Sequence, residues 1–147
     1  PAGAINSWIN HPKEFPQNLD YKKEWRSGAC RKTAKEEFWG FEDWKIVMKQ
    51  HITLEKKYTN FKIFQYENII HNLEEEIKKL FNFAGLRYTK QTIKFLKESQ
   101  SKNIDDHYAV YKDSSVASKW KTKLDLDIQK EIENDIKGTD LEVFLVE

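Results

Sequence analysis

The stretch FKIFQYENIIHNLEEEIKKLFNFAGL, residues 61–86, decides which fold the sequence predicts. Its first six residues are rich in aromatic and β-branched side chains, and they alternate: Phe61 and Ile63 fall on one face, Phe64 and Tyr66 on the other. Such alternation predicts a β-strand. Because helical patterns flank the segment on both sides, we expect a buried strand within an α/β sheet.

A helix is predicted directly after this strand. Asn72 is a favourable N-cap, and Glu75 follows three residues later, as in a capping box. Gly85 marks the end of the helix, because glycine readily adopts the left-handed conformation that terminates helices. The residues expected to face the core are Ile77, Leu80, Phe81 and Ala84.

Four further segments show the apolar spacing of helices, with residues recurring at three- and four-residue steps. These predicted helices cover residues 1–10, 38–58, 90–99 and 127–136, the last ending at Gly138. The sequence therefore predicts a mostly helical chain around the strand.

The segments between these helices carry punctuating residues or many charges. Residues 11–37 and 100–113 are predicted to be irregular, and a short helical piece is expected after Asp113. The closing LEVFLV, residues 141–146, fits either a short helix or a packed extended tail.

The composition describes a globular chain with balanced charge. Its 147 residues suffice for one domain with a core. The 25 Lys and Arg residues against 24 Asp and Glu residues argue against a dedicated nucleic-acid binder. No apolar run approaches the roughly 18 residues of a transmembrane helix, so no membrane segment is predicted.

The metal-ligating residue types show no metal-site pattern. Cys30 is the single cysteine, which excludes an internal disulfide and a cysteine-based metal site within the chain. The four histidines lack ligand spacing, and His107 beside Asp105 and Asp106 is the one weak suggestion of a metal or acid–base role. No metal site is therefore predicted.

Two candidate binding residues, Ser7 and Tyr66, come before the helix that is predicted to begin at Asn72. Ser7 follows a glycine-containing turn at the head of a predicted helix, where free N–H groups favour an anion; the alternative is a plain helix residue. Tyr66, followed by Glu67, stands at the end of the predicted strand, and ligands of open α/β sheets bind at carboxyl ends of strands. The alternative for this pair is a core aromatic residue and a helix-capping carboxylate.

A third candidate is the segment YKDSSVASKWK, residues 111–121. Ser114 and Ser115 present adjacent hydroxyls, and Lys119 and Lys121 follow about one helical turn later. Hydroxyls, backbone amides and ammonium groups at one helix start suit a phosphate. The alternative is a helix cap followed by a solvated basic face.

In this order and spacing the three segments resemble the C-terminal half of the PAPS-dependent sulfotransferases, in their carbohydrate and protein branch. These enzymes transfer a sulfuryl group from 3′-phosphoadenosine-5′-phosphosulfate (PAPS) and release PAP. The branch carries R-D-P-R-A-V, two variable residues and Ser; Pro1, Ala4 and Ser7 match its Pro, a small apolar position and its Ser. Ala2 departs from its second Arg, and its first Arg would precede Pro1, so we expect the chain to begin inside the 3′-phosphate motif.

The other two segments extend the resemblance. FQYENIIHNLEEEIKKLFNFAGL resembles the family's strand, Y-E-D-L, N-P-E and a helix ending F-L-G-L, which implies that Tyr66 lies near the adenine nucleotide. YKDSSVASKWKTKLD resembles Y-R-x-S-S followed by K-W-R. This match implies that Ser114 and Ser115 surround the 3′-phosphate and that Lys119 or Lys121 supplies positive charge.

The resemblance covers residues 1–10 and 40–147 and carries expectations about fold and domain. It implies an α/β fold: the C-terminal portion of a P-loop-like sulfotransferase fold, mostly helical, with one or two parallel strands of a central sheet. The chain, residues 1–147, would be the C-terminal part of a single sulfotransferase domain. Residues 11–39 would form a variable insertion on the acceptor side.

The resemblance also implies a reaction. An acceptor hydroxyl or amine, a carbohydrate group by preference, attacks sulfur in line and PAP leaves, without a metal. The family's phosphosulfate loop, catalytic Lys and acid/base residue belong to its N-terminal half, which we expect as the missing partner of this chain. The catalytic residues are therefore unknown, and the location, cytoplasm or Golgi lumen, stays open.

Two alternatives remain beside the enzyme. The chain could be a non-catalytic module that binds a nucleotide or a partner on the same scaffold. It could also be a helical interaction domain whose match to the family is accidental.

Overall fold

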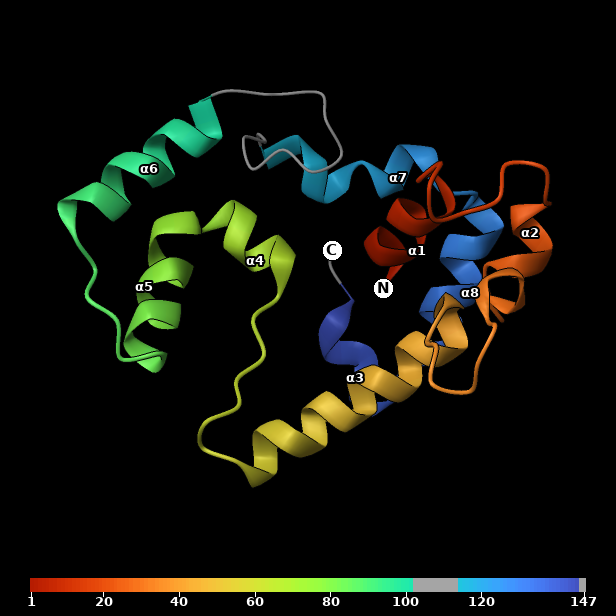
Figure 1. The fold of residues 1–147 in the computed structure, drawn as a ribbon, viewed down its shortest axis with the longest axis horizontal. Coiled ribbons are helices and arrows are strands. Elements are labelled where there is room, and N and C mark those ends of the chain that lie inside the picture. Colours follow the sequence, from red (N-terminus) through yellow and green to blue (C-terminus); the bar gives the residue numbers. More distant parts are fainter. Residues whose placement is uncertain (102–113, 146–147) are drawn as a thin grey trace. The chain divides into compact units, whose positions relative to one another are not determined.

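All the regular secondary structure in the part of the chain that the structure describes is helical. A computed structural model (Figure 1) describes residues 1–101 and 114–145. The α-helices are α1 (Ala2–Ile9), α2 (Tyr21–Glu24), α3 (Gly40–Lys57), α4 (Tyr66–His71), α5 (Leu73–Phe83), α6 (Lys90–Ser101), α7 (Trp120–Lys123) and α8 (Leu126–Ile136). Three 3₁₀ helices join them: η1 (Ala29–Arg31), η2 (Ser114–Ser118) and η3 (Asp140–Phe144).

The predicted α/β fold is wrong. Across residues 1–101 and 114–145 there is no strand and hence no parallel sheet, so the P-loop-like architecture is not present there. The buried strand was expected at residues 61–66; residues 61–65 are instead irregular, and Tyr66 is the first residue of α4.

Local contacts explain why the alternating segment does not form a strand. The backbone N–H of Ile63 donates to Glu55 Oε1 at 3.0 Å, and that of Phe61 donates to the Tyr58 carbonyl at 3.3 Å. The Phe64 ring packs on Phe83 of α5, with ring centroids 6.3 Å apart. The backbone N–H groups and the aromatic ring of this segment thus find their partners in neighbouring parts of the chain rather than in another strand.

The chain divides into two compact units, which we describe separately. The terminal unit comprises Pro1–Leu54 and Trp120–Glu147, and the central unit comprises Glu55–Lys119. The prediction of a single domain with an acceptor-side insertion at residues 11–39 stays a prediction.

The terminal unit holds the main hydrophobic core. Side chains four residues apart along α8 form one apolar stripe, and η3 adds its own apolar residues. The most deeply buried side chains are Phe41, Ile132, Ile136 and Leu141. The prediction of a helix ending near Gly138 is confirmed, and the closing segment takes the helical alternative as η3.

The other helix predictions are also confirmed with small shifts of their ends. Helix α1 lies within residues 1–10, α3 within residues 38–58, and α6 extends the predicted residues 90–99. Residues 11–37 are largely irregular apart from the short α2 and η1.

In the central unit, α5 packs against α4 and α6. The predicted helix and its end at Gly85 are confirmed: Gly85 has φ +67°, and Leu86 N–H donates to the Phe81 carbonyl at 2.8 Å. The capping box is wrong, because Asn72 stands at the N-cap position without a capping side-chain bond, and Glu75 instead pairs with Lys79 at 2.7 Å.

The side chains predicted to form the core of α5 are less enclosed than expected. Ile77, Leu80 and Phe81 are half-buried, and Ala84 is exposed. The central unit therefore buries fewer large side chains than the terminal unit among the described residues.

Candidate functional site

Two of the predicted binding segments lie side by side in the central unit. Helix α4, which begins with Tyr66, packs against η2, which contains Ser114 and Ser115. Lys119 follows η2 directly. Segments separated by about fifty positions in sequence thus meet, as a shared binding surface requires.

Tyr66 presents a protonated phenol at the start of α4. Its side chain is 52% exposed, and burial of the remainder, followed by the nearby Glu67 carboxylate, raises the pKa of the phenol. A tyrosine hydroxyl is protonated at neutral pH, and the raised pKa moves it further from ionisation, so it can donate a hydrogen bond to an anion.

The serine and lysine candidates occupy a short helical turn and the position after it. The helical piece predicted after Asp113 is confirmed as η2, with Asp113 itself outside the described residues. Ser115 and Lys119 are exposed, and the Ser115 carbonyl accepts a bond from Ser118 Oγ at 3.2 Å. This turn therefore offers hydroxyl and ammonium groups to solvent on one short segment.

Ser7 belongs to the terminal unit, whereas the other four candidates belong to the central unit. Helix α1 begins at Ala2, and its first backbone bond runs from Ile5 N–H to the Pro1 carbonyl at 3.1 Å. Ser7 consequently lies in the second turn, exposed, and beyond the open amides of the first turn.

No metal centre is found in the parts of the chain that the structure describes. Groups of three or more His, Cys, Asp or Glu side chains that could hold an ion are absent from these residues. The weak suggestion at His107, with Asp105 and Asp106, falls outside them.

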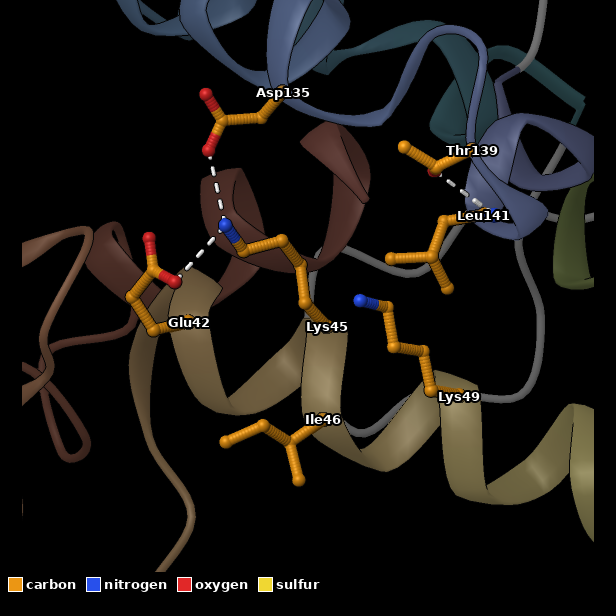
Figure 2. A pocket seen from close by; sticks show the side chains of 7 residues that line it. All are labelled: Glu42, Lys45, Ile46, Lys49, Asp135, Thr139 and Leu141. Carbon is orange, nitrogen blue, oxygen red and sulfur yellow. Dashed lines mark hydrogen bonds and ion pairs between the residues drawn. The ribbon is translucent and has the colours of Figure 1, made fainter.

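A pocket of about 230 Å³ opens in the terminal unit, and the sequence did not indicate it (Figure 2). Lys45 lines it, with Nζ 2.9 Å from Glu42 Oε2 and 3.0 Å from Asp135 Oδ2. The other lining residues are Ile46, Lys49, Thr139 and Leu141. The lining acids come from α3 and α8, which are far apart in sequence, so no local signal could have paired them.

The carboxylates of this pocket are structural rather than catalytic in character. Arg26 binds Asp135 Oδ2 at 2.7 Å, Glu42 Oε1 at 2.8 Å and Glu131 Oε2 at 2.9 Å. The Arg26 bond is the main cause of a lowered pKa at Asp135. Burial would raise the pKa of Glu42, but hydrogen bonds from Lys45 and Arg26 outweigh it and lower that pKa. A lowered pKa makes each carboxylate a weaker proton acceptor, and Arg26 and Lys45 already occupy its oxygens, so neither group suits the role of a general base.

Acid is expected to weaken the terminal unit through this network. The folded-state pKa values of Glu42 and Asp135 lie below their unfolded values of about 4, so their stabilisation is complete above pH 4 and is lost as pH falls through the folded values. Arg26→Met should cost about 1–2 kcal/mol near pH 7, after discounting for partly exposed partners, and should flatten the acid loss. Urea unfolding from pH 7 to 3 measures both effects.

Lys137→Met is the matched control for this prediction. Its ammonium is exposed and lies 3.8 Å from Glu133, so we expect a change of less than about 0.5 kcal/mol. An unchanged pH dependence in Arg26→Met would contradict the assignment.

Two searches, one for helices that could span a membrane and one for similar proteins, gave no match. Among residues 1–101 and 114–145, no helix combines the length and apolar character needed to cross a bilayer. Comparison of the chain with protein-family models, with curated proteins and with solved structures found no match.

Proposed function

We propose that the chain supplies the nucleotide side of the cofactor site in a PAPS-dependent sulfotransferase. Tyr66 contributes an aromatic ring and a phenol near the nucleotide. Ser114, Ser115 and Lys119 receive its 3′-phosphate. The proposal rests on the resemblance of these segments to the family.

The packing of α4 against η2 is the observation that carries the proposal. It brings the segment of Tyr66 beside that of Ser115, and a lysine follows at once. A phosphate binds best where several hydroxyl or amide donors and a cation converge, because charge-assisted hydrogen bonds are stronger than neutral ones. A protonated Tyr66 adds a donor and a π-face for a base.

The proposed reaction moves a sulfuryl group from PAPS to an acceptor hydroxyl or amine, with a carbohydrate acceptor favoured. The acceptor oxygen or nitrogen forms the new bond to sulfur, the bond from sulfur to the phosphate oxygen breaks, and PAP leaves with that electron pair. A base must take the acceptor proton, and no residue of this chain is assigned that role. The role of the named residues is to position the nucleotide.

PAP is expected to bind the intact protein and to raise its melting temperature, because a ligand that binds only the folded state stabilises it. Ser115→Ala or Lys119→Ala should each weaken PAP binding by about tenfold, since each removes a bond to a charged group. Isothermal titration with PAP, and with adenosine 5′-phosphate as the ligand lacking the 3′-phosphate, measures the effect.

Matched controls exist in the same unit. Ser101→Ala and Lys94→Ala change an exposed hydroxyl and an exposed ammonium on α6, and PAP binding should stay within about twofold of the unchanged protein. The proposal fails if PAP produces no shift in melting temperature, or if control and test variants lose affinity equally.

A non-catalytic partner-binding module is the second candidate. The central unit exposes several large apolar side chains, which are common at protein interaction surfaces. These residues are Tyr58, Tyr66, Phe83, Leu86 and Phe95. This candidate predicts that PAP leaves the melting temperature unchanged, so the same titration separates the two functions.

A further inference from the structure

The charged pocket of the terminal unit lies outside the proposed nucleotide site. All its lining residues belong to that unit, whereas Tyr66, Ser115 and Lys119 belong to the central unit. Its volume of about 230 Å³ is below the roughly 300–1,000 Å³ of pockets that hold drug-sized ligands. The pocket therefore suits a small metabolite rather than a nucleotide.

The ion-pair network along one side of this pocket carries one negative charge in excess. Its acids are Glu42, Glu131 and Asp135, and its cations are Arg26 and Lys45. Three carboxylates against two cations leave a net charge of −1. Glu42 and Asp135 each bind both cations, and an ionised carboxylate has about four acceptor positions, so each retains capacity for a further N–H donor.

A separate positive charge lines the same pocket. Lys49 follows Lys45 by four residues on α3, so the two side chains share one face of the helix. Figure 2 shows the Lys49 side chain rising from α3 toward Leu141. No carboxylate of residues 1–101 or 114–145 forms an ion pair with Lys49, and its side chain is exposed. The pocket thus presents an acidic side and a separate ammonium group.

The uncharged lining residues offer mainly aliphatic surface. Ile46, 48% exposed, and Leu141 are both aliphatic. The Thr139 hydroxyl already donates to the Ile136 carbonyl at 2.6 Å and accepts from Leu141 N–H at 3.2 Å. Polar recognition in this pocket therefore rests on its charged groups, beside an apolar contact.

We propose that this pocket binds a small aliphatic α-amino acid. The ligand's carboxylate pairs with Lys49, and its ammonium lies against Glu42 and Asp135, where it offsets the excess negative charge. Its side chain contacts Ile46 and Leu141. A zwitterion complements both charges of the pocket, whereas a simple anion would face the acids and a simple cation would face Lys49. The inference does not depend on the proposed sulfotransferase function.

The test compares three ligands that share one aliphatic side chain, each titrated into the full chain and followed by ¹H–¹⁵N NMR. Leucine carries both charges, 4-methylpentanoate lacks the ammonium, and isopentylamine lacks the carboxylate. Leucine should bind with a dissociation constant of about 1–10 mM, as expected for about nine non-hydrogen atoms. It should bind about five times more tightly than either analogue. Equal binding of leucine and one analogue, or no leucine-dependent shift, would overturn the inference.

Lys49→Gln tests the carboxylate contact. Leucine affinity should fall about fivefold while isopentylamine affinity does not fall, and Lys49→Arg should retain leucine binding because it keeps the charge. Lys130→Gln is the matched control, since Lys130 is exposed on α8 and does not line the pocket. Equal losses of leucine affinity in Lys49→Gln and Lys130→Gln would count against the site.

Glu131→Gln tests the excess charge without altering a lining residue. It removes one carboxylate from the network, so leucine affinity should fall while 4-methylpentanoate affinity stays equal or rises. The preference for leucine over 4-methylpentanoate should therefore drop by about twofold. Glu133→Gln is the control: this exposed α8 residue lies 3.8 Å from Lys137 and outside the network, so its variant should keep the full preference. An unchanged preference in Glu131→Gln would refute the charge argument.

PAP titration separates this inference from the proposed function. Lys49→Gln should leave PAP affinity unchanged while it weakens leucine binding. A protein that binds leucine but not PAP would retain the amino-acid site and lose the sulfotransferase proposal. A protein that binds PAP but none of the three small ligands would do the reverse.

Discussion

Gly28→Ala is expected to lower the free energy of unfolding of the terminal unit by about 3 kcal/mol, adding the cost of a left-handed alanine to that of overpacking. Gly28 has φ +63°, and a Cβ there would lie 2.4 Å from both the carbonyl carbon and oxygen of Trp39. These are backbone atoms of the residue directly before α3, so they cannot move aside as the end of a flexible side chain could. Urea unfolding followed by circular dichroism measures the loss.

Gly138→Ala separates the two contributions. Gly138 has φ +75°, close to that of Gly28, but a Cβ there would meet nothing within 4 Å. We therefore expect a loss of about 1 kcal/mol, from backbone conformation alone. Equal losses in the two variants would mean that the close approach of Gly28 to Trp39 is not a real constraint.

Helices with a regular apolar stripe could be predicted from the sequence. In α8 the buried isoleucines Ile128, Ile132 and Ile136 recur every four residues, and Gly138 follows, so both the element and its end are encoded locally. The same reasoning located α3 and α6, since each helix satisfies most of its own backbone hydrogen bonds.

The absence of the strand could not be predicted in this way, because an alternating segment forms a strand only beside a partner strand, and alternation does not reveal whether one is present. Phe61, Ile63 and Phe64 alternate as a strand would, yet Phe64 finds its contact on the α5 residue Phe83. Asn72 shows a related limit: it is shared between the end of α4 and the start of α5, so a local capping rule did not hold.

The candidate sites likewise differ in whether they depend on local sequence signals or on contacts between distant parts of the chain. Tyr66, Ser115 and Lys119 were singled out from local sequence patterns and then from the resemblance to a family, and their role stays a prediction; the structure shows that α4 contacts η2. The charged pocket depends on Arg26 meeting Asp135, which is 109 positions away. Such long-range pairing is decided by packing, not by any spacing within the sequence.

Phe41→Ala is expected to have the largest effect of all, about 3–5 kcal/mol, which would unfold a marginally stable unit. Phe41 is 0% exposed, and its ring centroid lies 5.6 Å from that of Trp25 and 6.0 Å from that of Trp44. The cations Arg26 and Lys45 lie 5.6 Å and 4.9 Å from its centre. Truncation would leave a cavity beneath aromatic rings and remove the apolar surface on which the ion-pair network rests.

Phe38→Ala deletes the same atoms three residues earlier, at a side chain that is 52% exposed, and should cost less than about 1 kcal/mol. Losses of similar size at Phe38 and Phe41 would contradict the burial assigned to Phe41. A double-mutant cycle of Phe41→Ala with Arg26→Met tests the link between core and network. Because the ring supports the guanidinium, the double variant should lose less than the sum of the single losses, by at least about 0.5 kcal/mol. Strict additivity would instead mean that the ion pairs hold Arg26 without help from the ring beneath it.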